Sequence, residues 1–83
     1  MASVRMRKYS EGKTNAHSVQ IGLVELYFSY ETCIAFDDGH ELVISENVWS
    51  TTTGRHLNAI CDDKSIRLPN AEFQKRLSAL TFA

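Results

Sequence analysis

The chain has 83 residues, of which 43% are hydrophobic and 23% are charged, and its formal net charge is −1. This length fits one domain, the composition excludes a disordered chain, and the charge gives no overall attraction to nucleic acid or to an anionic membrane. The apolar runs are too short to span a bilayer and the polar, basic start is unlike a signal peptide, so we expect a cytoplasmic protein with no membrane partner.

The charges are unevenly distributed along the chain. Residues 1–13 carry a net charge of +3, residues 14–54 contain six acidic residues and no Lys or Arg, and residues 55–83 carry +2. Segregation of this kind steers partners more than it stabilises a fold. Five acidic residues are therefore candidates for contact with a protein partner: Glu31, Asp37, Asp38, Glu41 and Glu46.

The N-terminal segment, residues 1–17, shows no sustained periodicity and is rich in polar residues. We predict that it forms a flexible basic arm in front of a single domain, residues 18–83. Removing residues 1–12 is then expected to leave the melting temperature nearly unchanged.

Residues 18–45 have the pattern of a sheet. Alternation over 19–23, a short run at 26–28 and two apolar runs at 32–37 and 40–45 predict three to four strands. Asp38-Gly39 predicts a two-residue turn, which pairs Phe36 with Glu41. Both faces of this hairpin are apolar, so each needs a cover, and we expect a homodimer to provide one.

After the sheet the period becomes helical. The spacing of Leu57, Ile60 and Cys61 predicts a helix from Thr53 to Cys61, with N-cap candidates among the hydroxyl residues before it.

A second helix is predicted from Pro69 to Leu80, because proline suits the first turn and Phe73, Leu77 and Leu80 form one stripe. The order of elements predicts an α+β fold, a small antiparallel β-meander followed by two short helices packed on one face.

The most unusual run contains four hydroxyl residues, a glycine and two basic side chains: Ser50, Thr51, Thr52, Thr53, Gly54, Arg55 and His56. Free amides at a helix N-terminus, hydroxyls and an arginine suit a phosphate or carboxylate, with Arg67 or the basic arm as helpers. It is not a Walker P-loop, because the Gly-Lys-Ser/Thr element is missing. The structural alternative is a helix cap with Arg55 in solvent.

Metal and catalytic sites are not favoured by the spacing of the His and Cys residues. No two of them have the spacing of a ligand pair, so we expect no metal and no cofactor. His56 and Cys61 lie about 140° apart on a helix, which disfavours a nucleophile–base pair. We therefore expect a protein that is not an enzyme.

A group of aromatic residues, Tyr27, Phe28, Tyr30 and Trp49, has a side-chain type that stacks on nucleobases. Single-strand binders place basic residues beside such rings, and the neighbours in this sequence are acidic. Packing in the core or an interface is the favoured interpretation.

Two segments, Tyr-Phe-Ser-Tyr at 27–30 and Asn-Val-Trp-Ser-Thr-Thr-Thr-Gly-Arg-His-Leu-Asn at 47–58, resemble a small domain of unknown function in bacteriophage and archaeal virus proteins. The resemblance implies a viral gene expressed in a microbial host and supplies no catalytic residues. The expected function is a non-enzymatic accessory protein that binds and inhibits a host protein or nucleoprotein complex, as in anti-CRISPR counter-defence. The alternative is a module that binds a nucleotide or nucleic-acid phosphate through Ser50–His56.

Overall fold

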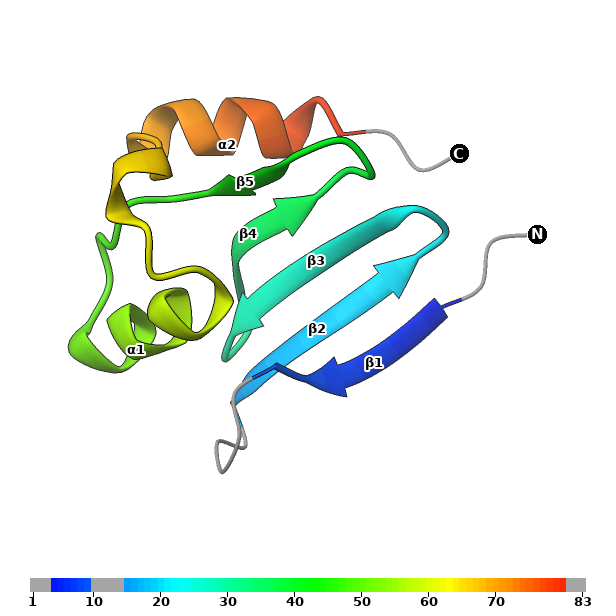
Figure 1. Cartoon of the computed structure of the whole chain (residues 1–83), viewed down its shortest axis with the longest axis horizontal. Helices are drawn as coiled ribbons and strands as arrows, with labels where there is room; N and C mark the ends of the chain where they lie inside the picture. The colour runs from blue at the N-terminus through cyan, green and yellow to red at the C-terminus, as the bar shows by residue number, and fades with distance from the viewer. Residues whose placement is uncertain (1–3, 10–14, 81–83) are drawn as a thin grey trace.

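Five strands follow one another across one antiparallel sheet in chain order (Figure 1). The computed structural model describes residues 4–9 and 15–80. The strands are β1 (Val4–Lys8), β2 (Ala16–Ile21), β3 (Val24–Ser29), β4 (Thr32–Asp37) and β5 (Leu42–Ile44). They are followed by α1 (Thr51–Ile60), the 3-10 helix η1 (Lys64–Ile66) and α2 (Asn70–Ser78). The predicted α+β meander with two following helices is confirmed, with five strands instead of three to four.

Strand β1 lies inside the segment predicted to be an arm. It pairs with β2 along its whole length, with Met6 opposite Val19, and β2 itself begins at Ala16. The period-two alternation of apolar and basic residues in β1 covers only five residues, too short a run to distinguish from a basic tail. The sheet therefore does not begin at the predicted boundary; residues 1–3 and 10–14 of the predicted arm lie outside the described residues.

The loop between β4 and β5 spans residues 38–41, so the predicted two-residue turn is wrong. Phe36 pairs with Val43 instead of Glu41. The Asp38 carboxylate stabilises the wider loop by accepting hydrogen bonds from two backbone N–H groups inside it, at 2.9 and 3.0 Å. Because the pairing shifts by two residues, every side chain of the hairpin keeps its predicted face.

The two helices pack against opposite faces of the β4–β5 hairpin. Leu57 of α1 lies in one core cluster with Ala35 and Ile44, whereas Phe73 of α2 lies in another with Phe36. Both helices were expected on one face of the sheet, and this expectation is wrong. The hairpin is apolar on both sides, and one helix of the same chain covers each side.

Helix α2 covers only part of its face of the sheet. Met6 pairs with Val19, Val19 with Leu26, and Leu26 with Phe36, so these four residues share that face. At the β1 end, beyond α2, Met6 is 72% exposed and Val4 is 63% exposed. The sheet thus carries an exposed apolar strip along β1.

Candidate functional site

The start of α1 is built by the Ser50–His56 run, and the helix begins at Thr51, two residues earlier than predicted. Ser50 is the N-cap, and its side chain accepts a hydrogen bond from the Thr53 backbone N–H at 3.2 Å. A Cβ on Gly54 would lie 2.9 Å from Nδ2 of Asn47, which donates to the Ser50 carbonyl oxygen. Gly54 therefore leaves room for the Asn47 amide to lie over the first turn of the helix.

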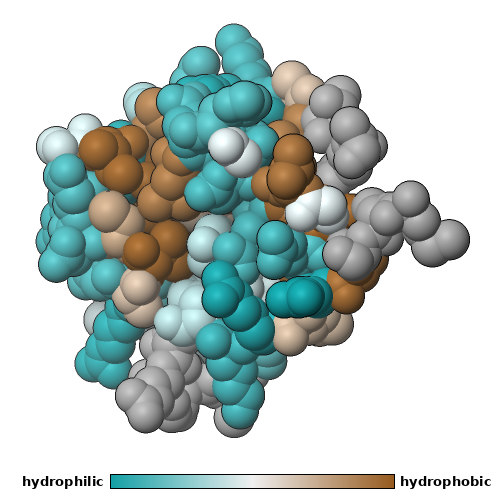
Figure 2. Space-filling view, turned by 45° about the vertical axis from the view of Figure 1, so that its right-hand side comes forward, coloured by the Kyte–Doolittle hydropathy of each residue, from teal (hydrophilic) through white to brown (hydrophobic). Residues whose placement is uncertain are grey.

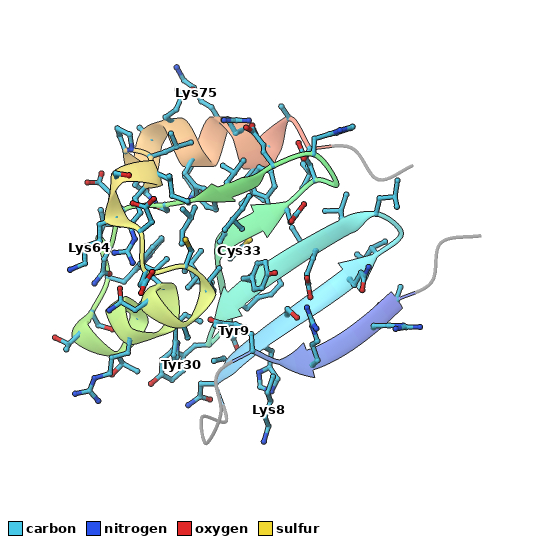
Figure 3. The ribbon with its side chains drawn as sticks, in the orientation of Figure 1. Lys8, Tyr9, Tyr30, Cys33, Lys64 and Lys75 are labelled. Atoms are coloured by element: carbon cyan, nitrogen blue, oxygen red, sulfur yellow. The ribbon has the colours of Figure 1, made fainter. Side chains whose placement is uncertain are left out.

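Two residues of the run anchor α1 to the sheet. Ser29 Oγ of β3 lies 2.9 Å from Thr53 Oγ1 and 2.7 Å from His56 Nδ1, and all three side chains are buried. Tyr9 and Tyr30 flank the His56 ring at the lower end of the sheet (Figure 3). The Ser–His contact has the geometry of a nucleophile and its base, but exposures of 2% and 1% leave a substrate no access. These residues stabilise the fold.

Three polar residues of α1, Thr51, Arg55 and Asn58, border a surface hollow of about 380 Å³. It is lined by Asn47, Thr51, Gly54, Arg55, Asn58, Lys64 and Arg67. Three of these residues are cations and none is acidic. The ion pairs in the described part of the chain, Arg7–Glu25 and Arg76–Glu41, use none of the three. No described carboxylate therefore forms an ion pair with the cations of the hollow.

Arg67 is the most firmly held cation of the hollow. Its Nη2 donates to Asn58 Oδ1 at 2.8 Å and to the Cys61 carbonyl oxygen at 3.4 Å. Its Nε is buried and, among the described residues, has no hydrogen-bond partner. A buried donor without an acceptor is costly, and an anionic oxygen or a water would satisfy it.

The chain reaches this arrangement by reversing after α1. The Asp63 side chain caps η1 by accepting from the Ser65 N–H at 3.0 Å. Leu68 then donates its N–H to the Ile44 carbonyl oxygen at 2.8 Å, which holds the chain against β5. Lys64 projects at the left edge of the molecule, beside α1 (Figure 3). The reversal brings Arg67 back beside Arg55, twelve positions earlier in the sequence.

Of the seven predicted site residues, three line the hollow: Thr51, Gly54 and Arg55. Ser50 is the N-cap of α1, and Thr53 and His56 anchor the helix to the sheet. Thr52 is exposed and does not line the hollow. Arg67 was expected as a helper. The other lining residues, Asn47, Asn58 and Lys64, were not predicted from the sequence.

The expected contribution of the basic arm does not hold for Arg7. Arg7 donates through Nε and Nη2 to the Glu25 carboxylate at 2.9 and 3.0 Å, and Glu25 also accepts from Ser18 Oγ and Tyr27 OH. Burial raises the pKa of Glu25, but the hydrogen bonds from Ser18, Tyr27 and Arg7 outweigh it and hold the pKa below its ordinary value of 4.5. This network attaches β1 to β3.

The five acidic candidates do not form one surface. Glu31 lies in the turn between β3 and β4, whereas Asp37, Asp38 and Glu41 lie at the opposite end of β4. Most of them have structural partners. Glu41 pairs with Arg76, and the side chain of Glu46 accepts from the Asn70 N–H at the start of α2.

Other reactive groups give no second site in the described part of the chain. Burial raises the pKa of the Cys33 thiol to about 11, which keeps it protonated. Within residues 4–9 and 15–80, no three His, Cys, Asp or Glu side chains are arranged to hold a metal ion. No helix in these ranges is long and apolar enough to cross a membrane.

Comparison with known proteins gives one match. Residues 3–75 match the model of a family of unknown function, DUF8033. No curated protein and no solved structure matches the chain.

Proposed function

This chain belongs to DUF8033, a family of unknown function, and we propose that it is a non-enzymatic binding module that holds a phosphate group in the basic hollow beside α1. The observation that carries the proposal is the convergence of Arg55, Lys64 and Arg67 on one hollow without an acidic neighbour among the described lining residues. Arginine presents several N–H donors in a planar fork that matches phosphate oxygens.

The other lining residues suit the same ligand. Asn47 and Asn58 supply amide groups, Thr51 supplies a hydroxyl, and Gly54 allows close approach to the first turn of α1. The N-terminus of a helix carries a partial positive charge, which adds to the three cations.

Binding without turnover is favoured by the residue types. The described lining residues are Asn, Thr, Gly, Arg and Lys, and none is His, Cys, Asp or Glu. General acid–base chemistry near neutral pH depends on side chains that can exchange a proton there. The composition of the site therefore favours holding a charged group over transforming it.

The test is calorimetric titration with inorganic pyrophosphate of the wild type and of two double variants. Arg55→Ala/Lys64→Ala removes two exposed cations of the hollow. Lys8→Ala/Lys75→Ala removes the same charge from exposed residues of β1 and α2 that do not line the hollow; they project at the bottom and the top of the molecule, whereas Lys64 projects at its left edge (Figure 3). We expect the first variant to lose about tenfold or more in affinity and the second to lose little, because a charge-assisted hydrogen bond contributes roughly 1.5–3 kcal/mol. Equal losses would show that net charge alone draws the anion.

A second candidate, supported by the exposed apolar strip on β1, is a protein-binding role. Val4 and Met6 are more than half exposed, and exposed apolar patches mark interaction surfaces. On the side seen in Figure 2, hydrophobic side chains reach the surface as patches separated by hydrophilic ones. The resemblance to viral proteins suggests a host protein or nucleoprotein complex as the partner to be inhibited.

Its test is light scattering and host-lysate capture with wild type and Met6→Asp. The strip predicts either a homodimer or a host partner, and in both cases Met6→Asp abolishes the association. A monomeric wild type that captures the same proteins as the variant would remove this candidate.

A further inference from the structure

The only tryptophan in the chain stands in the sequence between two residues that line the basic hollow. Trp49 stands between Asn47 and Thr51, both of which line the hollow. Its backbone N–H donates to Asn47 Oδ1 at 3.0 Å. The residue is 36% exposed. A partly exposed indole thus lies within two residues of two lining positions.

The sequence disfavours nucleobase stacking because the aromatic residues have acidic neighbours, but the fold brings three cations together in the hollow that Asn47 and Thr51 line. In the sequence, Trp49 follows a long acidic segment with no nearby Lys or Arg. In the structure, Arg55, Lys64 and Arg67 share a hollow with Asn47 and Thr51, which lie two positions before and after Trp49. Proteins that bind single strands combine cations that contact the phosphate backbone with aromatic rings on which the bases stack.

Building on the proposed function, we infer that the hollow receives a backbone phosphate of a single-stranded nucleic acid while a base of the same strand stacks on Trp49. A free mononucleotide is the less suitable ligand. Sites for small molecules bury 70–90% of the ligand. Here Asn47, Thr51, Arg55, Asn58 and Lys64 are all exposed, so the hollow is open to solvent and suits a strand that passes over it.

The inference predicts modest, salt-sensitive affinity. If three cations neutralise about three phosphates, the logarithm of the association constant falls with the logarithm of salt concentration with a slope of about −2. Loss of one stacked base costs roughly 1–3 kcal/mol, which is about a five- to 150-fold loss of affinity.

The probe is an oligothymidylate of about ten nucleotides, which lies within the range of about 4–16 nucleotides that single-strand binding sites cover. Quenching of Trp49 fluorescence reports stacking directly, since the chain has no other tryptophan. Polarisation of labelled oligonucleotide gives the affinity of the wild type, Trp49→Leu and Trp49→Phe. We expect quenching in the wild type, about five- to 150-fold weaker binding by Trp49→Leu, and recovery in Trp49→Phe, whose ring still stacks.

Pyrophosphate binding, measured by calorimetry on the same variants, separates this inference from the proposed function. Trp49→Leu is expected to bind pyrophosphate as the wild type does. If pyrophosphate binds, but the oligonucleotide does not quench Trp49 fluorescence and its affinity is the same for wild type and Trp49→Leu, the inference is overturned and the phosphate site stands. If neither ligand binds, both proposals fall. Thymidine monophosphate or duplex DNA bound as tightly as the oligonucleotide would overturn the assignment to a single strand.

Discussion

Replacing Glu25 with Gln tests whether β1 is an integral part of the fold. The Glu25 side chain is 14% exposed and accepts hydrogen bonds from Ser18, Tyr27 and Arg7. Gln keeps the volume and removes the charge. Charge-assisted hydrogen bonds are about twice as strong as neutral ones, so the bonds from Ser18 and Tyr27 each lose about 1 kcal/mol.

The contribution of the ion pair itself is small. The Arg7 side chain is 64% exposed, so solvent screening reduces the pair to less than about 1 kcal/mol. The total loss at neutral pH is therefore about 2 kcal/mol, which lowers the melting temperature of a domain of this size by roughly 8–16 °C. Glu72→Gln on the exposed surface of α2 is the control and should change the free energy of unfolding by less than about 0.5 kcal/mol.

The pH dependence of this loss has a definite sign. The pKa of Glu25 is depressed in the folded protein relative to its ordinary value of 4.5. The stability that Glu25 contributes is therefore complete above that value and is lost as pH falls through the lower, folded pKa. Thermal melts from pH 7 to pH 3 should show the gap between wild type and Glu25→Gln closing below about pH 4.5. A gap that is absent at pH 7, or that stays constant down to pH 3, would refute this account of the β1 attachment.

Three further predictions concern the core and the tyrosines. His56→Ala should reduce the free energy of unfolding by about 2–4 kcal/mol in urea denaturation, because it opens a cavity and removes the hydrogen-bond partner that Ser29 has in His56 Nδ1; a change below 1 kcal/mol would contradict the anchoring role. Phe73→Ala, at a fully buried position, should cost about 3–5 kcal/mol and broaden the thermal transition, and an unchanged melting curve would mean that α2 is not part of the core. Burial raises the pKa of Tyr27 to about 12 and also raises that of Tyr9, so the stability that the two protonated tyrosines contribute is complete below pH 10 and is lost as pH rises through their folded pKa values. In a pH titration, the tyrosinate absorbance of these residues should therefore not rise until the protein unfolds. Ionisation of all tyrosines near pH 10 in the folded protein would contradict this.

The strands and helices that have a strong local pattern were predictable from the sequence. The β4–β5 hairpin and the stripe of α2 around Phe73 depend on side-chain periodicity, which is a local property. Strand β1 was not predictable, because its five residues satisfy the alternation but carry three basic side chains typical of a tail. The turn at Asp38-Gly39 was predicted too tight, because the Asp38 side chain stabilises a wider loop equally well.

The candidate site was predictable only in part. Thr51, Gly54 and Arg55 belong to one local motif, whereas Lys64 and Arg67 reach them through a chain reversal capped by Asp63. The Asp-x-Ser spacing at 63–65 is the local signal of that turn, but the direction of the following chain is set by its pairing with β5. The anchoring role of His56 depends on Ser29, which is 27 positions away.

The Nε–Hε resonance of Arg67 in a ¹⁵N-labelled sample tests the phosphate site most directly. The Arg67 side chain lines the hollow, and its Nε–H is buried without a partner among the described residues, so an anion held at the guanidinium changes the environment of this proton. Titration with inorganic pyrophosphate should shift this resonance together with the backbone amides of Thr51 and Gly54, and leave those of Lys8 and Lys75 in place. Shifts confined to β1, or no shift of the Arg67 resonance while pyrophosphate binds, would contradict the proposed function.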